Sequence, residues 1–190
     1  MKLYLIRHGQ TDWNLHKRVQ GATNVPLNAT GLAQAADLRR QTADLEFEAC
    51  YASPLLRAAQ TAMIVVDGRT EIIYDSRLKE RSHGKFEGQY LPKWDLIKPD
   101  IFDREINTNV QGIEPIRSLD ARTGEFLQEI YYKYSETAKI MIVAHAGSLK
   151  SMLSSIMDYN SPEFRDFRFE QGQVYELDFW ARFLVDIIFT

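Results

Sequence analysis

Short runs of apolar residues alternate along this chain with longer segments in which apolar residues recur every three or four positions. The short runs predict strands and the periodic segments predict helices. Such alternation is typical of an α/β fold with a mainly parallel sheet. Strands are predicted at 2–6, 49–53, 71–75, within 139–147, at 174–180 and at 183–189. We therefore expect a three-layer α/β/α sandwich, in which helices flank a mostly parallel central sheet and the last two strands add an antiparallel edge.

Helices are predicted at 29–42, 54–66, 115–134 and 148–157. Asn28 suits the N-cap of the first helix, and Ser53 followed by Pro54 is a typical helix start, with serine as cap and proline as the first helical residue. The positions expected to face the core are Leu32, Ala35 and Ala36 in the first helix and Leu55, Ala59, Ala62, Met63 and Val66 in the second.

The segment 81–113 has neither a clean strand period nor a clean helical period, and it is interrupted by glycines and prolines. Because the chain shows no repeat and no linker, we predict a single domain over 1–190, with 81–113 as an excursion or lid over the site. Residues that would give such a lid apolar and basic contacts are Tyr90, Lys93, Trp94, Lys98, Phe102 and Arg104. The same residues fit a solvated surface with a few core anchors equally well.

Composition narrows the class of protein. The chain has 190 residues, a net charge of −3 and a charged fraction of 26%, which fits a globular domain without an electrostatic footprint for nucleic acid. Its one cysteine, Cys50, cannot form an intramolecular disulfide and is expected to be a buried, inert thiol. No apolar run has the length of a signal-peptide core or of a membrane span, so we expect a cytoplasmic protein without a membrane partner.

Cationic side chains follow two of the predicted strands directly. Arg7 and His8 follow the first strand, and His145 follows the strand within 139–147. Ligands of open parallel sheets bind at the carboxyl ends of strands, so the two histidines would meet at one edge if these strands are neighbours. Arg57, early in the second helix, would point to the same edge. Together they predict a pocket for a compact dianion such as a phosphoryl group, although each residue alone would more often be a structural rim residue.

Four segments, in this order, resemble motifs of the histidine phosphatase superfamily, the phosphoglycerate-mutase-like proteins. They are "LIRHGQTDWNLHKRVQGATNVPLNATGLAQA", "SPLLRAAQTA", "LKERSHGKFEG" and "IMIVAHAGSLKSML". By matching position, the resemblance implies that His8 is the nucleophile that becomes phosphohistidine and that Glu80 is the proton donor. It further implies a catalytic and substrate-binding set of Arg7, Asn14, Gln20, Gly21, Arg57, Glu80, His145 and Ala146.

The chemistry of these residue types is compatible with those roles. An imidazole can attack phosphorus through one nitrogen while a carbonyl holds the other, and a carboxyl group can protonate a leaving alkoxide. Glu80 would also suit an ion pair with Lys79 or Arg81. Ala144 and Ala146 flank His145 where many members have serine and glycine. The sequence therefore does not show which residue orients the His145 ring. His16 is expected in a loop, and His83 near the mouth of the site.

The resemblance favours a phosphatase that hydrolyses a small phosphorylated metabolite, in the manner of a histidine acid phosphatase. The interval from Glu80 to His145 is shorter than in true mutases, whereas "ERSHG" partly matches the mutase pattern. Phosphoglycerate mutase activity is therefore an alternative, and a non-catalytic module that binds a phosphorylated ligand is another. No metal-ligand spacing and no nucleotide-binding motif occurs, so we expect neither a metal nor another cofactor. Both a monomer and a homodimer fit the sequence.

Overall fold

The computed structural model describes residues 1–90 and 111–179 of the chain. Within them the chain forms a sheet in the order β3-β2-β4-β1-β5. The strands are β1 (Lys2–Arg7), β2 (Ala49–Ala52), β3 (Ile72–Tyr74), β4 (Lys139–Ala144) and β5 (Val174–Asp178). All neighbours are parallel except β5, which runs antiparallel to β1 at one edge. The mostly parallel sheet with an antiparallel edge is confirmed, while the strand predicted at 183–189 lies outside the described residues.

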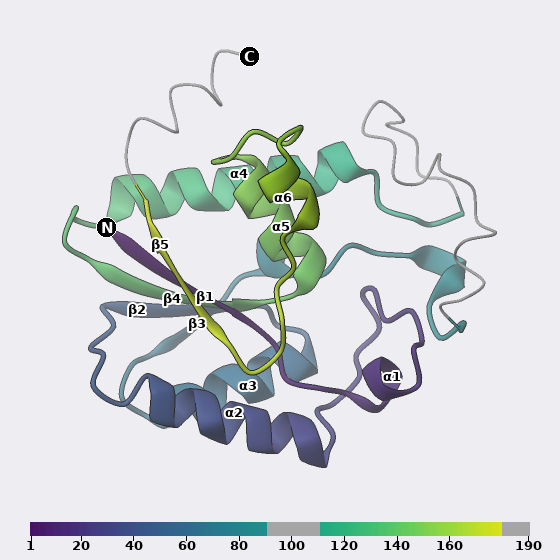
Figure 1. Cartoon of the computed structure of the whole chain (residues 1–190), viewed down its shortest axis with the longest axis horizontal. Helices are drawn as coiled ribbons and strands as arrows, with labels where there is room; N and C mark the ends of the chain where they lie inside the picture. Colours follow the sequence, from purple (N-terminus) through teal and green to yellow (C-terminus); the bar gives the residue numbers. More distant parts are fainter. Residues whose placement is uncertain (91–110, 180–190) are drawn as a thin grey trace.

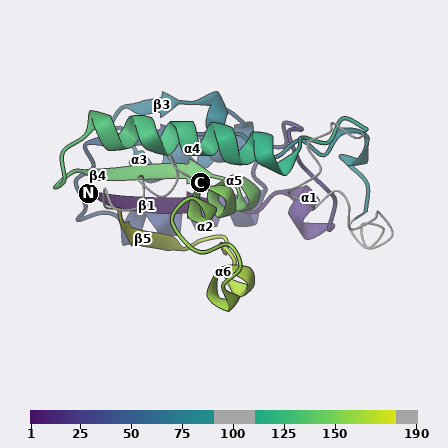
Figure 2. The same cartoon turned by 90° about the horizontal axis from the view of Figure 1, so that it is seen from above.

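Helices cover both faces of this sheet (Figures 1 and 2). α2 (Ala29–Gln41) and α3 (Leu56–Val66) lie on one face, and α4 (Ile116–Lys133) and α5 (Ala146–Ser154) lie on the other. Shorter elements are α1 (Asp12–Leu15), α6 (Pro162–Asp166) and the 3₁₀ turns η1 (Ser76–Leu78) and η2 (Gly84–Phe86). The predicted three-layer α/β/α arrangement is confirmed. Across 1–90 and 111–179, a helix that combines the length and the apolar character of a membrane span is not found.

The central strand β4 divides the core between the two faces. Ile140 and Ile142 pack in the cluster that includes α4 and α5, whereas Met141 and Val143 pack in the cluster with α3. Successive side chains of a strand point to opposite faces, so a continuous apolar run is what a strand buried on both sides requires. Cys50 lies in the second cluster, and burial raises the pKa of its thiol to about 12, as expected for an inert cysteine.

Predicted features of the first two helices are confirmed in part. Asn28 caps α2 through a hydrogen bond from the Gly31 amide (2.9 Å). Ala35, Leu55, Ala62 and Val66 are buried as predicted, whereas Leu32 and Met63 are 44% and 59% exposed. The buried face of α3 also carries Arg57, a residue that a hydrophobic pattern assigns to solvent. The third and fourth helices lie near their predicted positions, although α5 begins at Ala146 rather than at 148.

The Ser53-Pro54 helix start is also wrong. α3 begins at Leu56, and its N-cap residue, Leu55, makes no side-chain capping bond. The Ser53 hydroxyl lies next to the His145 ring. Of the proposed lid residues, Tyr90 is described and exposed, while Lys93, Trp94, Lys98, Phe102 and Arg104 lie outside the described residues. The single domain and the lid over 81–113 remain predictions.

Candidate active site

The two strand-end histidines meet at one edge of the sheet, as the sequence predicts. β1 and β4 are parallel neighbours with Arg7 opposite Ala144, and the His8 amide donates to the Ala144 carbonyl (3.0 Å). The rings of His8 and His145 lie 5.1 Å apart between centroids. Both side chains are buried, with relative exposures of 3% and 0%. The register of the sheet therefore places two imidazoles side by side.

The His8 ring is held in the form that a nucleophile needs. Its Nδ1 lies 2.7 Å from the Gly9 carbonyl oxygen, which can only accept a hydrogen bond, so Nδ1 carries the proton and Nε2 keeps its lone pair. Burial, reinforced by the nearby guanidinium of Arg57, holds the pKa of His8 well below its ordinary value. The ring is therefore neutral at neutral pH, with its lone pair on Nε2.

Arg57 faces that lone pair. Its Nε donates to His8 Nε2 (3.2 Å), and its two terminal nitrogens donate to the carbonyls of Thr23 (2.8 Å) and Gly21 (2.7 Å). The side chain is completely buried. Burial lowers the pKa of its guanidinium to about 10, so it is still charged at neutral pH. Arg57 is thus a fixed cation directly beside the candidate nucleophile.

The loop that orients Arg57 depends on Gly21 and Glu87. The Glu87 carboxylate accepts hydrogen bonds from the Ala22 amide (2.9 Å), the Thr23 hydroxyl and the His83 amide (3.0 Å). Gly21 has φ +53, and a Cβ there would overlap Glu87 Oε1, so only glycine fits this approach. The sequence predicts Gly21 as a pocket residue; its observed contact is with Arg57. The role of Glu87 was missed, because it depends on a contact between segments 64 residues apart.

Arg7 supplies a second cation to the same edge. Its Nη1 donates to the Phe169 carbonyl (2.8 Å), whereas its buried Nε has no hydrogen-bond partner among the described residues. Burial lowers the pKa of Arg7, although Glu80 partly opposes this. A buried donor without a partner is costly unless a ligand satisfies it. Arg7 is therefore suited to bind an anion.

Asn14 and Gln20 lie in the loop beside this edge. The Asn14 Oδ1 accepts from the Thr11 amide (3.1 Å) and from Gln171 Nε2 (3.0 Å), and Gln20 Oε1 accepts from the Thr11 hydroxyl (3.0 Å). Because these bonds occupy the amide oxygens, the NH₂ groups of Asn14 and Gln20 are the parts suited to donate to an anionic ligand. Their predicted contact with the phosphoryl group remains a prediction.

Ser53 supports His145. The Ser53 Oγ lies 2.7 Å from His145 Nε2, while His145 Nδ1 is buried and has no hydrogen-bond partner in the described parts of the chain. Burial, followed by the charge of Arg57, holds the pKa of His145 well below its ordinary value. If the Ser53 hydroxyl donates to Nε2, the neutral ring carries its proton on Nδ1 and can donate it to a ligand. A hydroxyl from the end of β2 thus supports His145, although alanines flank it in sequence.

If the site releases phosphate, as the resemblance implies, we predict that Ser53→Ala lowers kcat by about tenfold or more, because a small misplacement of a catalytic group is costly. Ser53→Thr keeps the hydroxyl and should restore most of the rate. The rates should be read together with the ¹⁵N shifts of the His145 ring, which report its tautomer and would not respond to a merely structural change. A wild-type rate and unchanged shifts in Ser53→Ala would show that Ser53 does not position His145.

The Glu80 carboxylate lies at the N-terminus of α5, which follows His145 directly. Its carboxylate accepts from the amides of Gly147 (3.0 Å) and Arg81 (2.9 Å). A Cβ on Gly147 would overlap Glu80 Oε1, so this glycine permits the approach. The Glu80 side chain therefore bonds to α5 rather than forming the ion pair that its basic neighbours would allow.

Arg122 of α4 braces the loop that carries Glu80. It donates to the backbone carbonyls of Glu80 (3.3 Å) and Arg77, and it forms a two-pronged ion pair with Glu114 (2.7 and 2.9 Å). The Glu114 carboxylate also accepts from the Ser82 amide (3.3 Å). Paired contacts of this kind hold a loop more rigidly than a single bond does. Sequence reasoning missed this brace because its parts are far apart in the chain.

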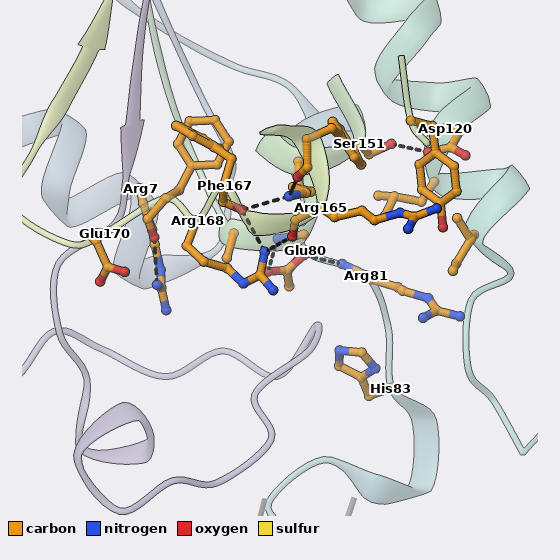
Figure 3. Close-up of a pocket in the computed structure, with 18 residues that line it drawn as sticks. Arg7, Glu80, Arg81, His83, Asp120, Ser151, Arg165, Phe167, Arg168 and Glu170 are labelled. Atoms are coloured by element: carbon orange, nitrogen blue, oxygen red, sulfur yellow. Dashed lines mark hydrogen bonds between the residues drawn. The ribbon is translucent and has the colours of Figure 1, made fainter. Parts of the chain in front are cut away.

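A cavity of about 820 Å³ opens beside Glu80 (Figure 3). Arg7 and Ala146 line it, as does His83, whose predicted place near the mouth of the site remains a prediction. The opposite wall comes from the segment 159–170, which includes α6. The sequence contains no signal that assigns this segment to the site. Within residues 1–90 and 111–179, no cluster of three or more His, Cys, Asp or Glu side chains could hold a metal ion.

Comparison with known proteins decides the family. A sequence profile of the histidine phosphatase superfamily (branch 1) matches residues 3–184. The chain belongs to this superfamily. Its relatives include the "Uncharacterized phosphatase PhoE" of Bacillus subtilis (strain 168), which is 32% identical over 92% of this chain and 86% of its own. A "2,3-bisphosphoglycerate-dependent phosphoglycerate mutase" of Rhizobium meliloti (strain 1021) is 30% identical over 80% of this chain and 77% of its own.

Solved structures of the superfamily share the fold. The alpha-ribazole phosphatase from Shigella flexneri superposes with a TM-score of 0.78 at 27% identity, over 96% of this chain and 92% of its own. The chain is thus a member of an enzyme family that contains both phosphatases and phosphoglycerate mutases. The residues that the resemblance assigns to the site are also those that the fold gathers at the carboxyl edge of β1 and β4.

Proposed function

We propose that this histidine phosphatase hydrolyses a phosphomonoester of a small metabolite through a phosphohistidine formed on His8. The observation that supports this most strongly is the fixed tautomer of His8. Its Nδ1 is bound to the Gly9 carbonyl, and its Nε2 lone pair faces the Arg57 guanidinium. A phosphoryl group that replaces His8 as the acceptor of the Arg57 Nε hydrogen would leave the Nε2 lone pair free to attack phosphorus.

In the first step Nε2 of His8 attacks phosphorus, the P–N bond forms, and the P–O bond to the alcohol breaks. Arg7, Arg57 and the Nδ1 proton of His145 stabilise the phosphoryl oxygens as charge spreads over them. The protonated Glu80 carboxyl gives its proton to the leaving alkoxide. Phosphoryl transfer needs mainly positioning and charge neutralisation, and the arginines of this site supply both.

In the second step water attacks the phosphohistidine. Glu80, now a carboxylate, takes a proton from that water as its oxygen bonds to phosphorus, and the P–N bond breaks. Inorganic phosphate leaves and His8 regains its neutral form. The same Glu80 thus acts as acid and then as base, so the enzyme returns to its starting protonation state after each cycle.

Mutase activity differs only in the acceptor, since a second hydroxyl would replace water. The relative from Rhizobium meliloti is named a phosphoglycerate mutase, whereas the relative from Bacillus subtilis is named a phosphatase. The phosphatase assignment rests on the phosphatase-named relatives and on the short interval between Glu80 and His145. The location in the cell and the oligomeric state remain predictions.

The proposal predicts phosphate release from a panel of phosphomonoesters that includes 3-phosphoglycerate. The assay should follow both free phosphate and the formation of 2-phosphoglycerate. Hydrolysis without isomerisation is the expected result. Isomerisation faster than phosphate release would favour the mutase. Tight binding of vanadate without turnover of any ester would favour the non-catalytic module.

We predict that activity is independent of added metal. Arg7 and Arg57 supply the positive charge that a divalent ion provides in other phosphoryl-transfer sites. Wild-type enzyme treated with EDTA should keep its kcat within about twofold, and added Mg²⁺ should not raise it. Activity that is lost in EDTA and restored by a divalent ion would contradict the prediction.

A further inference from the structure

The cavity beside Glu80 extends well past the point at which a leaving oxygen would sit. Gly147 bonds the Glu80 carboxylate, and Ser151, one turn later on α5, lines the cavity and donates to Asp120 (2.6 Å). Four residues of helix span about 6 Å. The cavity therefore extends about 6 Å along α5 from the residue that bonds Glu80.

The volume of the cavity also favours a large alcohol. At about 820 Å³ it lies in the upper part of the range that pockets for drug-sized ligands occupy. A phosphoryl group with a three-carbon alcohol would leave most of this space to water. The cavity thus has room for an alcohol with a ring or an extended chain.

The far wall is largely apolar. Leu119 and Phe164 are buried core residues whose surfaces line it, and Ile116 and Tyr159 complete it nearer to solvent. The Tyr159 ring is tilted against the Phe164 ring, with 5.3 Å between ring centroids. A partly exposed aromatic and aliphatic wall of this kind gains free energy when an apolar ligand surface covers it.

Two of the cations around the cavity, Lys150 and Arg168, are bonded to backbone carbonyls of the protein itself. Lys150 donates to the carbonyls of Phe164 and Phe167 (2.7 Å to Phe167) and lies 4.3 Å from the centroid of the Phe164 ring. Arg168 donates to the carbonyls of Arg165 and Phe167. These bonds fix the segment that forms the wall. Because these N–H groups already donate to protein carbonyls, fewer of them can bind a second anionic group of the substrate than the number of basic residues suggests.

Resting on the phosphatase proposal above, we propose that this cavity binds the alcohol part of the substrate and selects a bulky alcohol with an apolar ring face. Small anionic esters such as 3-phosphoglycerate would then be poor substrates. The selectivity arises in the cavity, because the phosphoryl end is the same for every monoester.

The experiment compares kcat/KM for propyl phosphate, 3-phenylpropyl phosphate and 3-phosphoglycerate. Propanol and 3-phenylpropanol have nearly equal basicity, so demand on the proton donor is matched and only the bulk of the alcohol differs. We expect 3-phenylpropyl phosphate to exceed both others by about tenfold or more. Equal values for the two alkyl esters, or a higher value for 3-phosphoglycerate, would overturn the inference.

Variants test whether the far wall of the cavity causes the preference for the phenylpropyl ester. Tyr159→Ala and Ile116→Ala should each lower the ratio of phenylpropyl to propyl ester several-fold; Tyr159 is 40% exposed, so its removal should not threaten folding. Tyr132→Ala, a 70% exposed residue of α4 away from the cavity, is the control and should leave the ratio unchanged. A ratio that survives both wall variants would place the selectivity elsewhere. If no ester releases phosphate, the phosphatase proposal itself fails.

Discussion

Replacing His8 with alanine is expected to reduce phosphate release by at least about a thousandfold, because the variant lacks the nitrogen that forms the P–N bond in the proposed mechanism. The ring contributes its bond to Gly9 and its contact with Arg57, and neither holds the core together. The variant should therefore fold. Circular dichroism should show the wild-type spectrum, and initial rates on p-nitrophenyl phosphate should show the loss.

His16→Ala is the matched control. His16 is an exposed histidine at the C-terminus of α1, whose ring lies 2.8 Å from the Asp12 carbonyl. It should keep wild-type activity. If folded His8→Ala retained more than a few per cent of the wild-type rate, the phosphohistidine mechanism would be wrong.

The second large effect separates the proton donor from the phosphoryl clamp, by which we mean Arg7 and Arg57, the arginines proposed to hold the phosphoryl oxygens. Glu80→Gln should lower kcat/KM for an alkyl phosphate by about a hundredfold or more, and that for p-nitrophenyl phosphate far less. An alkoxide needs a proton to depart, whereas nitrophenolate departs unaided. The comparison uses kcat/KM because this parameter reports the step in which the alcohol leaves, and not the later attack of water.

Variants of the clamp should behave differently. Arg57→Ala should lower kcat/KM for both esters by a similar factor of about 10²–10³, since the phosphoryl oxygens are the same in each. Arg7→Ala provides a second clamp variant in case the loss of the buried Arg57 destabilises the fold. Equal losses for both esters in Glu80→Gln would give Glu80 a positioning role. The proton donor would then have to be sought elsewhere, with His83 the first candidate.

The sequence was sufficient to predict the sheet and the meeting of the two histidines, because both depend on local signals. Apolar runs mark strands buried on two faces, and the same order of strand, histidine and glycine marks His8 and His145 as strand-end residues. Once β1 and β4 pair in parallel, both histidines lie at the same edge of the sheet. The burial of Arg57 on α3 could not be predicted in this way, because carbonyls from a distant loop stabilise it.

The support of the site depends on contacts between distant segments, which local patterns do not encode. Ser53 has the sequence signature of a helix cap, and its bond to His145 follows only from the pairing of β2 with β4. The wall of the cavity is tied to the catalytic edge by the bond between Arg7 and Phe169, which are 162 residues apart. Such contacts need the tertiary fold before they can be recognised.

The most direct test of the account is to trap the phosphorylated enzyme in Glu80→Gln. With p-nitrophenyl phosphate the first step should still proceed in this variant, while water attack lacks its base. The account predicts a burst of one nitrophenol per enzyme, with an acid-labile, alkali-stable phosphoryl group on the peptide that contains His8. Steady turnover with no phosphorylated enzyme, or a phosphoryl group on another residue, would contradict it.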